Sequence, residues 1–262
     1  MCKLKKCFLR LGKVTMFFSK KVASRGPPQP IIQCFVRYST YSSASVHKER
    51  PSDFSYEACH YNLLETKDSR IELTYFLDLA VEKDHFLRGK AIEIREGTEA
   101  GSFLKLLSTV QNLDLHPDTI IYFLEDDYLH RPGWVDALFE AFSLDADYVT
   151  LYDHGDKYTA YPKLKSEIYV TKSCHWRTTP STTNTYAMRF STLKKDLSIH
   201  ERFSLGRKIS RDHDKFCFLR KKGAKLISPM PGFSTHVDPK FLSPCIDWNP
   251  YFKKEHLCKH QH

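Results

Sequence analysis

The chain has 262 residues, of which 41% are hydrophobic and 13% aromatic, so it can bury a sizeable core and is not an intrinsically disordered protein. Its net charge of +9 would suit a nucleic-acid-binding protein. Residues 1–30, however, hold eight Lys or Arg and no Asp or Glu, whereas residues 31–262 hold 32 Lys or Arg against 31 Asp or Glu. The nearly neutral body argues against a nucleic-acid-binding domain.

Residues 1–30 form a separate basic segment that ends in the proline-rich stretch PPQP. Its uncharged runs are too short to cross a bilayer or to form the core of a signal peptide. Three alternatives stay open: an amphipathic segment on an anionic membrane surface, an organelle-targeting presequence, or a disordered leader. We predict a flexible basic arm over 1–30, one folded domain over 31–250, and a tail over 251–262.

The eight cysteines include no Cys-x-x-Cys pair, and several lie in apolar patterns where free thiols are common. This usage indicates a reducing compartment. We therefore expect a cytoplasmic protein. If residues 1–30 form an amphipathic segment on a membrane surface, the protein would lie on the cytoplasmic face of that membrane.

Beyond the arm, patterns typical of strands and helices alternate along the chain. We expect strands over residues 31–38, 71–77, 91–95, 120–124 and 147–152. Helical patterns fall near 55–64, from the run GTEAGSF at 97–103 through about 112, over 132–142, and from 211 toward 219. Such alternation predicts an α/β fold in which helices flank a mostly parallel central sheet. No internal repeat divides the chain, so a single domain is expected.

Polar residues follow two of the expected strands. Asp78 ends the second strand, where its carboxylate can accept hydrogen bonds from a base or ribose, although such an Asp is also a common turn residue. The run GTEAGSF at 97–103 has two glycines, which permit close backbone approach, and it opens a helix with free amide groups. The same run is a good helix N-cap and turn.

The strongest signal is the stretch IIYFLEDDYLH at 120–130, an apolar run that ends in three adjacent carboxylates, Glu125, Asp126 and Asp127. A run of this kind fits a buried parallel strand, and open α/β sheets bind ligands at the carboxyl ends of such strands. Three acids in a row repel one another unless a cation or hydrogen-bond donors neutralise them. A divalent metal that holds a diphosphate would do so. An acidic turn before a helix is the alternative.

Later in the chain, residues 175–185 read HWRTTPSTTNT and combine an aromatic ring with a cation, an amide and many hydroxyls. Hydroxyl and amide groups beside a tryptophan face suit sugar recognition, because a pyranose offers both hydroxyls and an apolar face. We expect a sugar-binding surface formed by His175, Trp176, Arg177, Thr182 and Thr183. A polar hairpin is the alternative for the same residues.

Two further groups are candidates for chemistry. Asp212 and Asp214 lie in RDHDKF, at the start of a helical pattern, where both are also good N-cap residues. His236 ends the run PGFSTH after a strand-like stretch, and a solitary histidine is usually structural.

These motifs, taken in order over roughly residues 31–248, resemble the family-2-like GT-A glycosyltransferases. The acidic triplet is similar to their Asp-x-Asp region, with Glu125 and Asp127 at the two acidic positions and Asp126 at the variable one. The first acid departs from the family's commoner Asp. The resemblance implies a single GT-A, Rossmann-like domain that transfers a sugar from a nucleoside diphosphate sugar to a hydroxyl of a glycan, lipid or other acceptor. It further implies inversion by direct displacement.

The resemblance also implies roles for individual residues. Mn²⁺ or Mg²⁺ would be held by Asp127, with Glu125 and His236. The residues that would bind the donor are Asp78, Gly101, Ser102, Glu125 and Asp126. The sugar-binding surface expected within 175–185 would face the acceptor, because in the family this region follows the metal site and helps to build the acceptor side. Inverting enzymes of this kind use one carboxylate as a base toward the acceptor hydroxyl. The family's motif is commonly Glu-Asp where this chain has Asp-His-Asp, so the base is Asp212 or Asp214, and we favour Asp212.

Two other classes stay open. A nucleotidyltransferase would share the nucleotide pocket, but it usually carries a Gly- and Lys-rich signature after the first strand, and the residues from Arg37 onward lack one. A non-catalytic nucleotide-sugar-binding protein, or a nucleic-acid binder that uses its basic arm, would not need Asp212.

Overall fold

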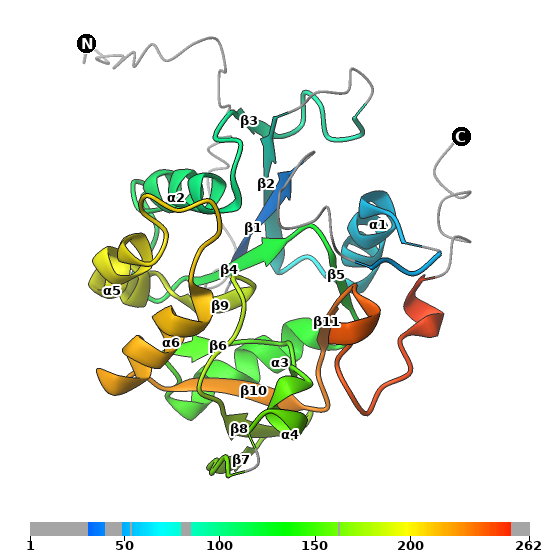
Figure 1. Cartoon of the computed structure of the whole chain (residues 1–262), viewed down its shortest axis with the longest axis vertical. Coiled ribbons are helices and arrows are strands. Elements are labelled where there is room, and N and C mark those ends of the chain that lie inside the picture. Colours follow the sequence, from blue (N-terminus) through cyan, green and yellow to red (C-terminus); the bar gives the residue numbers. More distant parts are fainter. Residues whose placement is uncertain (1–30, 40–48, 53, 80–84, 162, 253–262) are drawn as a thin grey trace, which may run out of the picture.

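The computed structural model describes residues 31–39, 49–52, 54–79, 85–161 and 163–252 (Figure 1). The predicted basic arm lies outside the described residues, so its proposed membrane contact stays a prediction. Tyr251 and Phe252, which we assigned to the tail, instead belong to a short 3-10 helix, η3 (Asn249–Phe252), and Phe252 is buried. Within the described ranges, no helix is both long and apolar enough to span a membrane.

A nine-stranded sheet occupies the centre, in the order β3-β2-β1-β4-β9-β6-β10-β8-β7. Its strands are β1 (Ile32–Ser39), β2 (Ile71–Asp78), β3 (Ile92–Ile94), β4 (Ile120–Glu125), β6 (Tyr148–Val149), β7 (Ile168–Val170), β8 (His175–Thr178), β9 (Tyr186–Arg189) and β10 (Leu226–Met230). Only β8 and β9 run opposite to the other seven. The predicted α/β fold with a mostly parallel central sheet is confirmed.

Helices cover both faces of this sheet (Figure 1). They are α1 (Tyr56–Thr66), α2 (Glu99–Val110), α3 (Trp134–Ala141), α4 (Asp156–Thr159), α5 (Phe190–Arg202) and α6 (Asp212–Lys221), with 3-10 helices η1 (Phe142–Leu144) and η2 (Pro239–Phe241). Side chains of α1 and α3 pack in one core, and side chains of α2, α5 and α6 pack in the other. The central strands β1 and β4 are buried from both sides and therefore read as continuous apolar runs.

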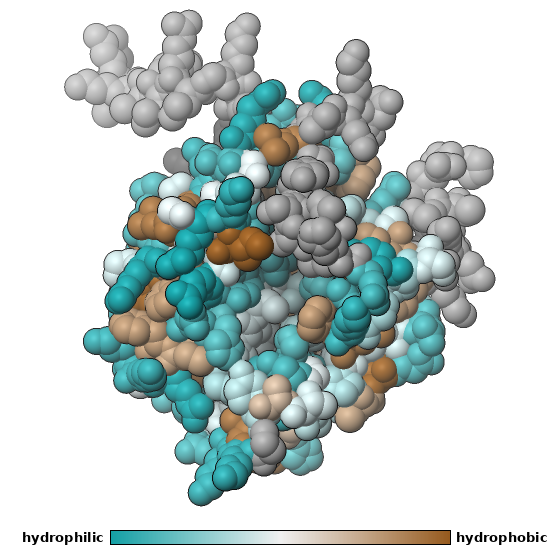
Figure 2. All heavy atoms as spheres, in the orientation of Figure 1, coloured by the Kyte–Doolittle hydropathy of each residue, from teal (hydrophilic) through white to brown (hydrophobic). Residues whose placement is uncertain are grey.

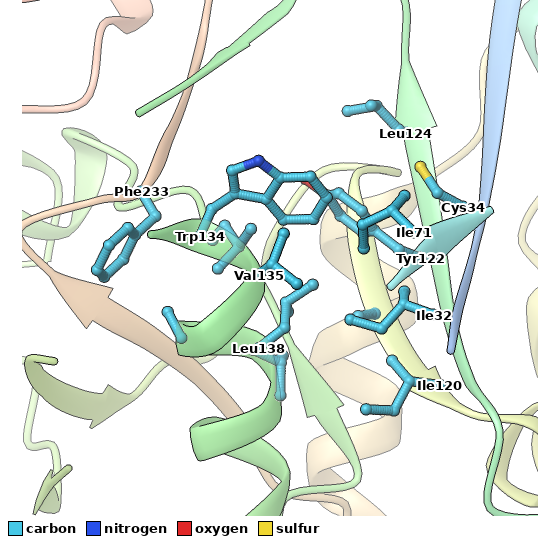
Figure 3. Packing of buried hydrophobic residues seen from close by; sticks show 14 of the residues in the cluster. Ile32, Cys34, Ile71, Ile120, Tyr122, Leu124, Trp134, Val135, Leu138 and Phe233 are labelled. Atoms are coloured by element: carbon cyan, nitrogen blue, oxygen red, sulfur yellow. The ribbon is translucent and has the colours of Figure 1, made fainter. Parts of the chain in front are cut away.

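The alternation of side chains along β4 divides it between these two cores. Ile120, Tyr122 and Leu124 face α3, as Figure 3 shows, while Ile121 and Phe123 face α2 and α5. Because β4 is buried on both faces, its first polar side chain marks the point where the chain leaves the sheet. That point is Glu125.

A second, two-stranded sheet stands beside the end of β4. It pairs β5 (Tyr128–His130) with β11 (Ser234–His236) in antiparallel fashion. Leu129 and Val237 pack with Trp248 in a third small core. The ribbon brings residues near the acidic triplet into contact with residues about a hundred positions later. The sequence patterns did not predict it, nor did they predict α5, β7, β8 or β9.

Candidate functional site

The three acids of the triplet diverge, because the strand ends at the first of them and the next two form a turn. Glu125 remains in the sheet, where its Oε1 accepts a hydrogen bond from Arg37 Nη2 at 3.3 Å and its Oε2 accepts one from Thr185 Oγ1 at 3.3 Å. Asp126 Oδ2 accepts a hydrogen bond from the Ser39 amide at 3.0 Å. Asp126 therefore ties the end of β1 to the end of β4.

Asp127 is 2% exposed and lies between two cationic or basic side chains. Its Oδ2 atom is 2.8 Å from Arg50 Nη2 and 3.2 Å from His236 Nε2. Arg50 also donates to the carbonyl of Val237 and stacks on the ring of Phe54. The acid is thus neutralised by an arginine that is held at three points.

These contacts bear on the predicted metal site. Within the described ranges, no group of three or more His, Cys, Asp or Glu side chains is arranged to hold a metal ion. Glu125 is directed to Arg37 and Thr185 and does not join Asp127 and His236, because the turn after β4 breaks the strand alternation that would have aligned the two acids. Mg²⁺ is often bound through one or two carboxylates and completed by substrate phosphates. Asp127 and His236 offer one carboxylate and one imidazole for a metal of that kind, and Arg50 Nη2 contacts the same carboxylate oxygen as His236 Nε2.

A buried network of charges extends from Glu125 into the core. Arg37 donates from Nη2 to Oε1 of Glu99 at 3.1 Å, and Asn184 Nδ2 donates to the same oxygen at 2.9 Å. Asn184 in turn accepts a hydrogen bond from Lys215 Nζ at 2.6 Å. Lys215 is 1% exposed, and burial lowers its pKa to about 8 although nearby carboxylates act in the opposite direction. This network joins strand β4 to helix α6.

The two acids of α6 have different surroundings. Asp214 Oδ2 pairs with Arg211 Nε at 2.6 Å on the surface, where the Asp214 side chain is 40% exposed. Asp212 is half-buried at the first position of the helix, and its Oδ1 accepts a hydrogen bond from the His213 amide at 2.8 Å. Burial raises its pKa while the charge of Lys215 acts to lower it. The partly desolvated carboxylate near a buried cation is the one suited to proton transfer. Asp212 therefore stays our candidate for the base.

The hydroxyl-rich run between β8 and β9 makes hydrogen bonds to other protein groups around the site. Ser181 Oγ contacts His213 Nδ1 at 3.0 Å, Thr182 Oγ1 donates to Thr150 Oγ1 at 3.0 Å, and Thr185 Oγ1 accepts a hydrogen bond from the Glu125 amide at 3.2 Å. Most of these hydroxyls are buried and bonded to protein, as Thr182 is. The expected acceptor-binding role of Thr182 is therefore not supported by its surroundings.

Of the three other acceptor candidates, two are buried and one is exposed. Trp176 is fully buried, and its Nε1 donates to Thr171 Oγ1, so it offers no exposed face to a sugar, contrary to our expectation. Arg177 is buried and pairs with Asp153 Oδ1 at 2.5 Å. His175 is exposed at the start of β8 and pairs in backbone register with Met230 and Val170. Strand β8 is covered on both faces, which explains the burial of Trp176 and Arg177.

The predicted donor residues outside the triplet shape the loop between β3 and α2. Asp78 is fully buried, and its Oδ1 accepts a hydrogen bond from the Glu96 amide at 2.8 Å while its Oδ2 accepts one from the Gly97 amide at 3.1 Å. The Gly101 amide donates to the N-cap oxygen, Thr98 Oγ1, at 3.0 Å. A Cβ at Gly101 would lie 2.8 Å from that oxygen. Asp78 and Gly101 thus hold the loop, and Ser102, in the next position of α2, is 3% exposed.

A cavity of about 210 Å³ opens beside Asp127. Its walls are Tyr152, His154, Thr183, His236 and Phe241. Thr183 is the one predicted acceptor residue among them, and its Oγ1 lies 2.8 Å from Tyr128 Oη. The cavity therefore connects the hydroxyl-rich run with the His236–Asp127 pair.

The backbone beside this cavity is close-packed at Gly232. A Cβ there would overlap Ser243 Oγ and lie 3.1 Å from the Asp153 amide nitrogen. We expect Gly232→Ala to lower the free energy of unfolding by about 1–3 kcal/mol through overpacking. Urea unfolding measures the loss. Gly155→Ala is the matched control, because its nearest new neighbour would be the Leu242 carbonyl at 4.0 Å. Equal unfolding midpoints for the two variants would contradict the expectation.

Several residues of the site were not predicted from the sequence. Arg37 and Lys215 are cations within apolar patterns, and this mismatch was the available signal for a buried ion pair. Glu99 looked like an ordinary first-turn acid of a helix. Arg50 lies in an irregular segment and Phe241 ends the three-residue helix η2, and neither segment is long enough to show a period in the sequence.

No protein-family model and no curated protein matches the chain. Among solved structures, residues 1–349 of TarS from S. aureus are similar at a TM-score of 0.43 and 12% identity, over 80% of this chain and 59% of that one. The inositol-1-phosphate CTP transferase from T. maritima has a TM-score of 0.45 and 16% identity, over 85% and 94% of the two chains. A nucleotidyl transferase from Methanothermobacter thermautotroptrophicus has a TM-score of 0.41 and 15% identity, over 77% and 87%.

Proposed function

We propose that the chain is a glycosyltransferase that moves a sugar from a nucleoside diphosphate sugar to a hydroxyl acceptor by direct displacement. The observation that carries this proposal is the position of Asp212. It is a separate, half-buried carboxylate on α6, and Lys215, whose charge acts on it, is joined through Asn184, Glu99 and Arg37 to Glu125 at the end of β4. One acid is thus available as a base while others face the donor.

In this proposal, the donor lies at the carboxyl ends of β1, β2 and β4. Asp78 and Gly101 fix the loop that borders it, Ser102 packs beside it, and Asp126 and Glu125 set the end of β4. Open α/β sheets bind nucleotides at this edge. The nucleotide contacts the loop backbone more than the Asp78 carboxylate, because two amides already occupy that carboxylate.

Asp127 and His236 would hold Mn²⁺ or Mg²⁺ together with the diphosphate. When bound, such an ion neutralises charge on the departing diphosphate. Arg50 moves from Asp127 toward the phosphates, where a guanidinium binds well. Asp212 takes the proton from the acceptor hydroxyl as that oxygen forms its bond to the anomeric carbon and the bond to the diphosphate breaks. Lys215 and Asn184 keep α6 in place during this step.

A thermal-shift screen tests the donor site. Purified protein is heated with UDP-, GDP-, CMP- and dTDP-sugars, each with Mn²⁺ and with EDTA. We expect one nucleotide class to raise the melting temperature in a metal-dependent way, since a ligand at 100 times its Kd stabilises the native state by about 2.7 kcal/mol. Asp127→Asn should remove this shift.

Turnover assays with the selected nucleotide complete the test. Release of nucleoside diphosphate from the sugar donor supports the proposal, whereas pyrophosphate release from a nucleoside triphosphate with a sugar phosphate would support nucleotidyl transfer instead. A folded protein that responds to none of these nucleotides at saturating concentrations would contradict both enzyme classes.

A further inference from the structure

The cavity beside Asp127 has walls that differ from those of a phosphate or nucleotide site. Among the described residues that line it, four present rings, namely Tyr152, His154, His236 and Phe241, and the fifth presents the hydroxyl of Thr183. None of these described lining residues is an Asp, Glu, Lys or Arg. Rings and one hydroxyl complement an uncharged ligand better than they complement a phosphate group.

The rings form a fixed platform at the mouth of the cavity. Tyr152 Oη donates to the Phe241 carbonyl, and the His154 ring lies 5.0 Å from the Tyr152 centroid and 5.7 Å from that of Phe241. The His236 ring meets Phe241 edge to face, with centroids 6.0 Å apart. Phe241 nevertheless remains 43% exposed. An aromatic ring held in place and left open to solvent is suited to stack on a ligand at low entropic cost.

The size of the cavity limits what can enter it. About 210 Å³ is below the roughly 300–1,000 Å³ of sites that hold drug-sized ligands. It has room for one small ring and not for a whole nucleotide. Hydrophobic residues on the face shown in Figure 2 occur in small separate groups among hydrophilic ones, which argues for a local ligand site and against a broad apolar docking surface.

We propose that this cavity binds one uncharged pyranose ring, with its apolar CH face on Phe241 and a ring hydroxyl at Thr183. A pyranose combines these two surfaces, and aromatic rings with a nearby polar group complement both. The inference rests on the proposed function and deepens it, because it makes a neutral sugar the group beside Asp127. That sugar is either the one carried by the donor or a residue of a glycan acceptor. Both sources would present the same kind of ring, with an apolar CH face and hydroxyls.

Saturation-transfer NMR with methyl pyranosides tests the inference directly. We expect the protons of one CH face to receive more saturation than the hydroxymethyl protons. Phe241→Ala should weaken binding about tenfold, while Phe241→Trp should retain it. Mannitol, which has hydroxyls but no ring, should show no such pattern. Val170→Ala is the matched control, since Val170 is also an exposed apolar residue but lies in β7, the last strand of the sheet.

Competition then identifies the source of the ring. A nucleotide sugar from the thermal-shift screen displaces the pyranoside if the donor's sugar fills the cavity, whereas the matching nucleoside diphosphate alone does not. If neither displaces it, the cavity holds an acceptor sugar. Equal binding to wild type and a folded Phe241→Ala protein, or equal transfer to mannitol, would overturn the inference. Neither outcome would contradict the proposed donor site. The donor site is contradicted by a different result, namely that no nucleotide binds.

Discussion

Asp212→Asn is expected to reduce sugar transfer by about 10²–10⁴-fold while leaving the affinity for the nucleotide sugar almost unchanged. The asparagine keeps the shape of the side chain but cannot accept the proton of the acceptor hydroxyl. The loss should therefore appear in kcat with the donor at saturation, and donor affinity from calorimetry should match that of the wild type. Asp212 does not contact the acids at the end of β4 in any described hydrogen bond, which is why donor binding is spared.

Asp214→Asn is the matched control for this variant, since it makes the same chemical change two residues away. Asp214 lies on the exposed side of α6 and pairs with Arg211, and surface ion pairs of this kind contribute about 0–1 kcal/mol. Transfer by Asp214→Asn should stay close to that of the wild type. A dead Asp214→Asn with an active Asp212→Asn would show that the base was assigned to the wrong acid, and equal unfolding of both would favour a structural role.

The pH dependence of kcat/KM tests the assignment of Asp212 as the base independently. Burial raises the pKa of Asp212 above its ordinary value, with the charge of Lys215 acting against that shift. The base form is the ionised carboxylate, so kcat/KM should fall as pH drops through this raised pKa. Asp212→Asn should lose that limb of the profile, because its amide does not titrate.

The architecture could be predicted from local patterns, because strands buried on both faces read as continuous apolar runs. Glu125 marks the end of such a run, and the structure places it at the carboxyl end of β4 as expected. The ribbon of β5 and β11 could not be predicted, since its three-residue strands are too short to show a period. Its partners are joined only by the folding of the whole domain.

The site was predicted less completely, for a different physical reason. Thr and Asn side chains bind sugars with the same donors and acceptors that they use to bind other protein groups. Thr182, Thr185 and Asn184 are engaged internally, and no pattern in the sequence separates that use from ligand recognition. Trp176 shows the same ambiguity, because an aromatic residue beside polar ones can equally lie in the core.

Glu99 is the central residue of the buried network of charges. Of the variants considered, Glu99→Gln is expected to lower the free energy of unfolding most. Three donors converge on its two oxygens: Arg37 Nη2 and Asn184 Nδ2 on Oε1, and the Ser210 amide on Oε2 at 2.7 Å. A glutamine must turn its own NH₂ group toward at least one of them. Removing one charge of a buried pair typically costs about 3–5 kcal/mol, so denaturant unfolding should show a loss of that order.

The dependence of this loss on pH distinguishes the charge of Glu99 from its shape. Burial alone would raise the pKa of Glu99, but the charge of Arg37 and the hydrogen bonds from Ser210 and Asn184 outweigh it and hold the pKa below its ordinary value of 4.5. The native carboxylate therefore stabilises the fold above pH 4.5, and this stabilisation disappears as pH falls through the lowered pKa. The stability difference between wild type and Glu99→Gln should shrink over that window. Glu96→Gln, which changes an exposed acid three residues earlier, should be nearly neutral throughout. Equal effects of the two variants would mean that the Arg37–Glu99 pair contributes no net stability.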